Sequence, residues 1–155
     1  MKLYTIKKHN ILPIDLEQAW NFFSNPRNLQ RLMPENMKFE VKSDLPHEIY
    51  TGQLIEYKVS PFKGFNTKWV TEITHVERLK YFVDIQLYGP YKLWHHKHFF
   101  KEVDDGVLIE DLVHYRVPFG LVGESLHPSI IQPKLDSIFK AREKNLETIF
   151  GIIKK

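Results

Sequence analysis

The stretch that decides the fold covers residues 81–100 and reads Y-F-V-D-I-Q-L-Y-G-P-Y-K-L-W-H-H-K-H-F-F. It predicts two strands joined by a turn at Gly89-Pro90. Because side chains alternate between the two faces of a strand, one predicted face combines large aromatics with a few polar groups. That face carries Phe82, Asp84, Gln86 and Tyr88 from the first strand, and Trp94, His96, His98 and Phe100 from the second. Such a face is typical of a ligand pocket, and equally of a crowded core whose polar groups are paired.

The composition is that of an ordinary globular protein, apart from its many aromatic residues. The chain has 155 residues, of which 43% are hydrophobic, 26% charged and 14% aromatic. This length suits one domain with a sizeable core. The formal net charge of +3 is mild, and the lysines and arginines are scattered. A nucleic-acid binder is expected to carry a basic stripe, so we expect no nucleic-acid partner.

Cysteine content and hydropathy bear on the compartment in which the protein works. The sequence contains no cysteine, which removes disulfides, thiol catalysis and thiolate zinc sites. The N-terminal residues lack the apolar core of a signal peptide. No run approaches the roughly 18 apolar residues of a membrane span. We therefore expect a cytoplasmic protein that does not insert stably into a membrane.

The N-terminal part predicts one strand followed by two short helices. The strand covers residues 3–12, and Asp15 is placed to cap the first helix. Ser24-Asn25-Pro26 ends that helix and begins the second, with Pro26 at its first position. Further strands are predicted at residues 37–41, 52–59 and 65–76, with a turn at 61–65 that could stand at the entrance of a cavity.

The last strand carries an acid on its inward face. Asp104-Asp105-Gly106 predicts a hairpin turn, followed by a strand over residues 107–117. Every second residue of this strand belongs to its more apolar face, and Asp111 lies in the middle of that face. Because an unpaired buried carboxylate is costly, Asp111 is expected to have a partner.

The tail, from about residue 126 to residue 150, predicts the longest helix. Pro128 and Pro133 predict a kink or a late start, and Gly151 is a candidate C-terminal cap. Arg142 interrupts the apolar stripe of this helix. The sequence leaves three alternatives for its side chain: it reaches the mouth of a cavity, pairs with an acid such as Asp111, or pairs at the surface. The stripe consists of Ile131, Leu135, Ile138, Arg142, Leu146 and Ile149.

The order of elements predicts an α+β architecture. A run of hairpin-linked strands implies a curved antiparallel sheet of about seven strands. The two short helices follow the first strand. The C-terminal helix, about 25 Å long over residues 134–150, can cross the concave face of the sheet. A curved sheet closed by one helix leaves a cavity between them.

Six motifs spread over nearly the whole chain carry a family resemblance. They are F-S-N-P-x-N-L-x-x-L at residues 23–32, G-x-x-I-x-Y at 52–57, W-x-T-x-I at 69–73, F-x-D-x-Q-x-x-G-P-Y-x-x-W-x-H-x-H-x-F at 82–100, D-x-V-x-Y-x-x-P-F-G at 111–120, and L-x-x-I-F-x-x-R at 135–142. With these motifs the chain resembles the START-like (SRPBCC) superfamily, and within it a bacterial ligand-binding, polyketide cyclase-like group.

The resemblance implies a helix-grip fold over residues 1–155, as one ligand-binding domain of the birch-pollen-allergen type. It implies a concave face that binds a hydrophobic or amphipathic small molecule, such as a lipid, a polyketide or a related metabolite. The superfamily itself hosts several roles on one scaffold, so we base the expectation of binding on the aromatic inward face beneath one long helix. The expected ligand-binding residues are Tyr57, Trp69, Phe82, Asp84, Gln86, Trp94, His96, His98, Asp111, Tyr115 and Arg142.

The polar residues of this face allow three interpretations. They can hydrogen-bond one another and hold the strands in register. They can orient a ligand in an aromatic cavity. They can also do chemistry, with His96 and Asp84 or Asp111 as the acid–base pair of a small cyclase or isomerase. We expect a binder rather than an enzyme. A third function, a protein-interaction scaffold without a ligand, predicts an exposed apolar patch, which could equally serve a homodimer.

We expect no metal and no cofactor. His96 and His98 lie two apart on a strand and could ligate one ion with Asp84 or Asp111, but His-Lys-His alone is a weak signal. His75 is the other histidine predicted to face inward. The remaining histidines considered, His9, His47 and His127, are predicted in solvent or in loops. Glycine-rich phosphate loops and the H-E-x-x-H pattern are absent from the sequence. The oligomeric state is left open between monomer and homodimer.

Overall fold

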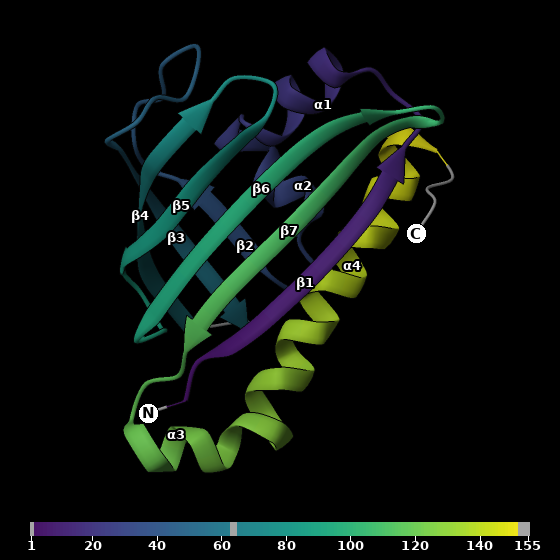
Figure 1. Ribbon diagram of the computed structural model, residues 1–155. Helices are drawn as coiled ribbons and strands as arrows, with labels where there is room; N and C mark the ends of the chain where they lie inside the picture. The colour runs from purple at the N-terminus through teal and green to yellow at the C-terminus, as the bar shows by residue number, and fades with distance from the viewer. Residues whose placement is uncertain (1, 63–64, 152–155) are drawn as a thin grey trace.

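The chain folds into a curled antiparallel sheet with helices packed on its concave face (Figure 1). The computed structural model describes residues 2–62 and 65–151. The strand order β1-β7-β6-β5-β4-β3-β2 makes a seven-stranded sheet, as the sequence predicts. The strands are β1 (Tyr4–Leu12), β2 (Lys38–Val41), β3 (Gln53–Phe62), β4 (Phe65–Glu77), β5 (Tyr81–Tyr88), β6 (Leu93–Val103) and β7 (Gly106–Arg116). The tip of the predicted turn at residues 61–65 lies outside the described residues.

Two short helical segments follow β1, as predicted. The α1 helix (Leu16–Phe23) begins with a capping box, in which the Asp15 carboxylate accepts from the backbone of Gln18 at 2.7 Å and the Gln18 amide oxygen accepts from the backbone of Asp15 at 3.2 Å. A 3₁₀ turn, η1 (Pro26–Asn28), and α2 (Leu29–Leu32) come next. Pro26 occupies the first position of the turn, where its missing N–H costs nothing.

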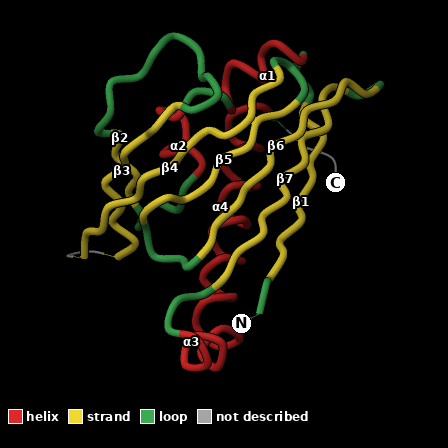
Figure 2. Tube along the Cα trace, turned by 60° about the vertical axis from the view of Figure 1, so that its left-hand side comes forward, coloured by secondary structure: helices red, strands yellow, loops and turns green. Residues whose placement is uncertain are grey.

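The C-terminal helical run is longer than predicted. It begins with α3 (Gly120–Leu126), continues through a π turn, η2 (His127–Ile131), and ends with α4 (Gln132–Phe150). Pro128 lies in the π turn and bends the run without ending it, which is how a missing N–H is commonly accommodated. Gly151 caps α4 by donating to the Glu147 carbonyl at 2.9 Å. Figure 2 shows α4 behind the sheet, with α3 at one end of the molecule and α1 at the other.

Two hydrophobic clusters lie between the sheet and the helices. One gathers around α1 and the far end of α4 and includes Trp20, Phe82 and Leu146. The other lies near the start of α4 and includes Tyr115 and Leu135. Buried apolar area is the main stabilising term in such a core, and here it is divided into two parts.

The α3 end of the molecule exposes large apolar side chains. Phe119, Leu121 and Val122 are 83%, 82% and 65% exposed. This is the kind of patch that the interaction-scaffold hypothesis predicts. Among the described residues, no helix combines the length and the apolar character needed to cross a membrane.

Strand register positions the polar residues of the inward face. Across β5 and β6, Phe82 pairs with His98 and Asp84 pairs with His96. Across β6 and β7, His98 pairs with Asp111. Paired residues on adjacent strands present their side chains to the same face, so these four polar residues lie side by side.

His75 does not face inward, contrary to the expectation from strict alternation. The β4–β5 register shifts between Ile73 and His75, so that Ile73 pairs with Asp84 but His75 with Val83. An extra residue at a bulge reverses the alternation beyond it. His75 is therefore exposed, and Val76 packs against the core instead.

At Gly106 the β6–β7 hairpin comes very close to the end of β1. Its φ is +135°, and a Cβ added there would lie 2.0 Å from the Leu12 carbonyl oxygen. Gly52, with φ +90°, has open space at the same position. We expect Gly52→Ala to cost about 1–2 kcal/mol through backbone strain. Gly106→Ala is expected to exceed that cost by about 1–3 kcal/mol because of the clash. Equal losses in urea unfolding would contradict the close approach.

Candidate functional site

A buried carboxylate, Asp111, lies at the centre of the candidate site. Only 5% of this residue is exposed, and it projects from β7 toward α4. The Arg142 guanidinium donates from Nε to Asp111 Oδ2 at 3.2 Å and from Nη2 to Oδ1 at 3.1 Å. The pairing resolves the alternatives that the sequence leaves open for Arg142. A bidentate guanidinium satisfies a buried carboxylate better than a point charge does.

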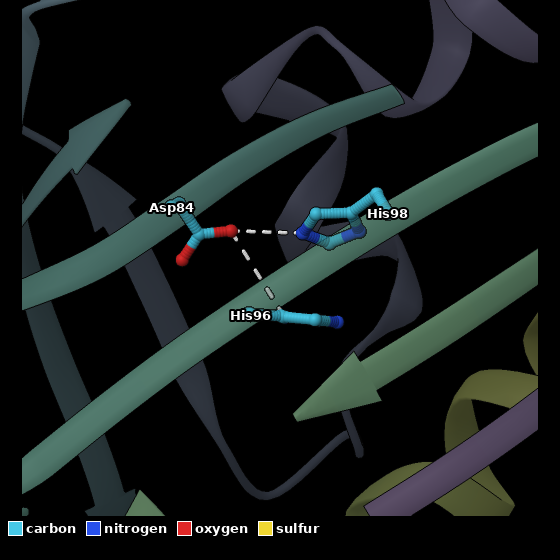
Figure 3. Close-up of side chains that lie close together, drawn as sticks. All are labelled: Asp84, His96 and His98. Carbon is cyan, nitrogen blue, oxygen red and sulfur yellow. Dashed lines mark hydrogen bonds and ion pairs between the residues drawn. The ribbon is translucent and has the colours of Figure 1, made fainter. Parts of the chain in front are cut away.

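Two histidines of β6, His96 and His98, lie between Asp111 and a second carboxylate, Asp84 of β5. Figure 3 shows both rings beside Asp84. His96 Nε2 lies 2.9 Å from Asp111 Oδ1, and His98 Nε2 lies 2.8 Å from Asp84 Oδ2. His96 Nδ1 is 4.0 Å from Asp84 Oδ2. His98 Nδ1 approaches Asp111 Oδ1 to 3.1 Å, close enough for an ion pair but not aligned for a hydrogen bond. The two rings lie 3.7 Å apart between their centroids.

The charges of this cluster shift the pKa values of its members in different directions. Burial alone would raise the pKa of the Asp111 carboxyl, but the charge of Arg142 and the imidazoles of His96 and His98 hold that pKa well below its usual range. Burial, with the neighbouring His98, lowers the pKa of His96. Burial also acts against the charged form of His98, but Asp111 and Asp84 together outweigh it and raise the His98 pKa above its ordinary value.

An aromatic wall continues from the cluster along the inward face. The Trp94 ring lies 6.3 Å from the His96 ring and 5.7 Å from the Trp69 ring, between centroids. Tyr91 packs against Trp94 at 4.8 Å and Tyr115 at 5.9 Å. The Trp69 indole N–H donates to Thr71 Oγ1 at 3.1 Å, so its polar atom is satisfied within the protein. The wall thus presents ring surfaces rather than unsatisfied donors.

Exposure separates the predicted ligand-binding residues into two groups. Trp69, Asp84, Trp94 and His96 are half-buried, and water reaches the two polar groups among them, because 16% of the Asp84 side chain and 12% of the His96 side chain are exposed. The half-buried Gln86 has a different role, because its amide donates to the Tyr91 carbonyl at 2.7 Å and braces the hairpin. The other predicted residues are buried: Tyr57, Phe82, His98, Asp111, Tyr115 and Arg142.

Two residues of this region were missed by sequence reasoning. From the sequence, Tyr91 is placed on neither predicted strand face, yet its ring joins the aromatic wall. His127 was predicted in solvent or in a loop, but it is buried in η2. It stacks on Tyr4 with centroids 3.6 Å apart and lies 2.7 Å, through Nε2, from the Tyr115 hydroxyl. That prediction was wrong because the ring packs against Tyr4 and Tyr115, which are distant in sequence. The Y-x-x-W spacing in the hairpin is the signal that could have found Tyr91.

Two surface hollows lie away from this cluster. One, of about 700 Å³, is open to solvent between the start of α1 and the β6–β7 hairpin, and Pro13 and Glu102 are among its lining residues. The other, of about 330 Å³, lies between η1 and the segment before β3, next to Arg27 and Pro46. Neither contains a residue of the aromatic wall or of the charged cluster. The size of a hollow does not by itself identify a functional site. Polar groups converge on the inward face, and we therefore take that face as the candidate site.

Comparison with known proteins supports the fold. No protein-family model matches the chain, and no curated protein matches its sequence. Solved structures do resemble it, including a structural-genomics target from Chromobacterium violaceum with a TM-score of 0.72 and 14% identity, over 96% of this chain and 97% of that one. A protein from Thermus thermophilus gives a TM-score of 0.66 and 13% identity, over 96% and 99%.

The fold class follows from a further likeness. Ara h 8.0201 aligns with a TM-score of 0.59 and 14% identity, over 95% of this chain and 99% of that one. At such identities the likeness shows the fold alone. The protein has the α+β helix-grip fold of Bet v 1-like proteins, with a curled antiparallel sheet gripping a C-terminal helix.

Asp111→Asn tests the buried pair. Removing the charge leaves Arg142 buried without its counter-ion, so the free energy of unfolding should fall by about 3–5 kcal/mol. Glu110→Gln is the matched control: the neighbouring residue on the opposite face pairs with Lys7, whose side chain is 60% exposed. Glu110→Gln should lower the free energy of unfolding by less than about 1 kcal/mol. Equal effects of the two variants in denaturant unfolding would show that Asp111 is not the centre of the cluster.

Protonation of the buried His127 is expected to make the stability of the fold depend on pH. Burial lowers its pKa below 6.5, and Tyr115, whose pKa burial raises to about 12, keeps its proton for the shared hydrogen bond. The unfolded chain therefore binds more protons than the folded protein as the pH falls through 6.5, and acid should destabilise the fold through this residue. We expect the loss of unfolding free energy between about pH 7.5 and pH 5 to be smaller in His127→Gln than in the unchanged protein. An identical pH dependence of both proteins would show that His127 does not contribute to the acid destabilisation.

Proposed function

We propose that this protein binds a hydrophobic or amphipathic small molecule between the sheet and α4. One observation carries the proposal: large rings and charged groups on the inward face, Trp69, Trp94, Asp84 and His96, are only half-buried. A face that serves only as core is normally closed by its own side chains. A lipid, a polyketide or a related cyclic metabolite would lay its apolar body against the two indoles.

Polar recognition is assigned to Asp84 and His96. Both lie at the end of the aromatic wall, so a ligand with one polar end and an apolar body matches the arrangement. Beneath them, Asp111, His98 and Arg142 are buried, and Asp111 pairs with both of the others. Such a supporting layer limits the rotamers of the contact residues and reduces the entropy lost on binding.

The proposal also retains the bacterial ligand-binding, polyketide cyclase-like group that the sequence motifs suggest, and the expected cytoplasmic setting without nucleic-acid partners. The acid–base alternative uses His96 with Asp111 as its orienting partner, at 2.9 Å. Binding alone is the simpler function, because it requires only the wall and the cluster. The exposed side chains of α3 leave room for a homodimer or a protein partner beside this function.

An uncharged probe with an aromatic body and one polar N–H group tests the proposal. Titration with N-phenyl-1-naphthylamine, followed by its fluorescence, should show saturable binding that Trp94→Ala weakens about tenfold or more, since each tenfold change corresponds to about 1.4 kcal/mol. The probe also binds exposed apolar patches, so the double variant Leu121→Ser/Val122→Ser on α3 is the control. Its affinity should be unchanged.

The outcomes separate the hypotheses. Binding that is lost in the α3 variant but kept in Trp94→Ala would place the apolar site on α3 and contradict the proposal. Native mass spectrometry of the gently purified protein provides a second test. A co-purifying apolar metabolite that disappears in Trp94→Ala would support the proposed site and reveal the ligand class.

A further inference from the structure

Three potential metal ligands converge on the inward face, from two adjacent strands. Asp84 Oδ2, His96 Nδ1 and His98 Nε2 all lie within 4.8 Å of one another. The carboxylate oxygen is 2.8 Å from the His98 nitrogen and 4.0 Å from the His96 nitrogen (Figure 3). Bonds to zinc are about 2.0–2.2 Å long, so ligand atoms of one tetrahedral ion lie about 3.3 Å apart. The two separations from the carboxylate oxygen bracket that value, so small side-chain movements would bring the atoms toward the spacing of a metal site.

The backbone holds these groups in position. Asp84 and His96 are direct partners across β5 and β6, and His98 follows two residues later on the same face. Sites built on paired strands vary less than sites built on loops. The Phe82 ring stacks on His98 with centroids 4.2 Å apart and restricts its rotation.

The other nitrogen of each ring faces a single carboxylate. His96 Nε2 lies 2.9 Å and His98 Nδ1 3.1 Å from Asp111 Oδ1, and Arg142 holds Asp111 in turn. Histidines that bind metals usually direct their second nitrogen to a carboxylate or carbonyl, which fixes the ring and the coordinating nitrogen. Asp111 has that relation to His96 through a hydrogen bond and lies at ion-pair distance from His98, so an outer carboxylate supports both rings.

We infer that Asp84 Oδ2, His96 Nδ1 and His98 Nε2 bind one divalent transition-metal ion. Two imidazoles and one carboxylate form the donor set that suits ions such as Zn²⁺ and Fe²⁺. With neutral imidazoles, the two carboxylates exceed the single guanidinium by one negative charge, which a cation would offset. Exposure of 16% of the Asp84 side chain and 12% of the His96 side chain provides a path for the ion and room for a water or ligand atom.

This inference differs from the sequence-based expectation of no metal. His-Lys-His alone was a weak signal, and the sequence left the third ligand open between Asp84 and Asp111. Strand pairing places Asp84 directly opposite His96. The inference does not rest on the proposed small-molecule binding, since metal affinity can be measured without any organic ligand. Failure of one would leave the other standing.

The first test is equilibrium binding of Co²⁺ and Zn²⁺ to the full chain after treatment with EDTA. We expect one ion per chain, with visible absorption of the Co²⁺ complex. Asp84→Asn and His96→Gln should each weaken binding about a hundredfold, at the upper end of the losses seen even for supporting residues. His95→Gln is the matched control, because His95 lies on the same strand but on the opposite face, beside His114.

The results decide between a built site and chance binding. A single ion that is lost in Asp84→Asn and retained in His95→Gln supports the inference. Absence of binding at submillimolar metal, binding unchanged in Asp84→Asn, or binding lost in His95→Gln overturns it. Circular dichroism and thermal unfolding of each variant show whether the fold persists.

A second measurement needs no variant. Nitrogen-15 NMR of the Zn²⁺-loaded protein distinguishes the two nitrogens of each imidazole. The geometry requires coordination by Nδ1 of His96 and by Nε2 of His98, because the opposite nitrogens face Asp111. Coordination through the same nitrogen type in both rings would contradict the assigned arrangement.

Discussion

The buried ion pair between Asp111 and Arg142 is the interaction on which the rest of this structure depends. A carboxylate inside a core is tolerable only when its oxygens are bonded and its charge is offset. Arg142 meets both needs from α4, with contacts of 3.0–3.2 Å. The pair therefore joins the last strand of the sheet to the helix that covers it. It also lies between the two hydrophobic clusters, where apolar packing alone would not select one position of the helix.

The same pair connects the fold to the candidate site. Asp111 contacts His96 and His98 through one oxygen and Arg142 of α4 through both. A movement of α4 would therefore shift Asp111 and, with it, both rings. Those rings face Asp84, which is reached by water, and the aromatic wall begins beside them at Trp94. Stability and recognition thus share atoms, which is a common arrangement in pockets where buried polar groups fix the geometry of exposed ones.

Sequence reasoning was most accurate where structure is local. The alternation along β7 correctly placed Asp111 inward, and the acid's need for a partner was correctly inferred. Helix signals located the cap at Asp15 and the end of α4 at Gly151. It failed where one residue changed a register: the bulge in β4 turned His75 outward, and no pattern within that strand announces the extra residue.

By itself, the sequence determined the order of elements and, where no bulge interrupts a strand, which residues share a face, because side-chain period and capping depend on near neighbours in the chain. Only the tertiary structure decided which partners meet. His96 bonds Asp111 rather than Asp84, and His98 takes Asp84, because inter-strand register and the docking of α4 set those distances. Such contacts join residues 14, 15 and 31 positions apart, and their geometry is a property of the packed sheet and helix together.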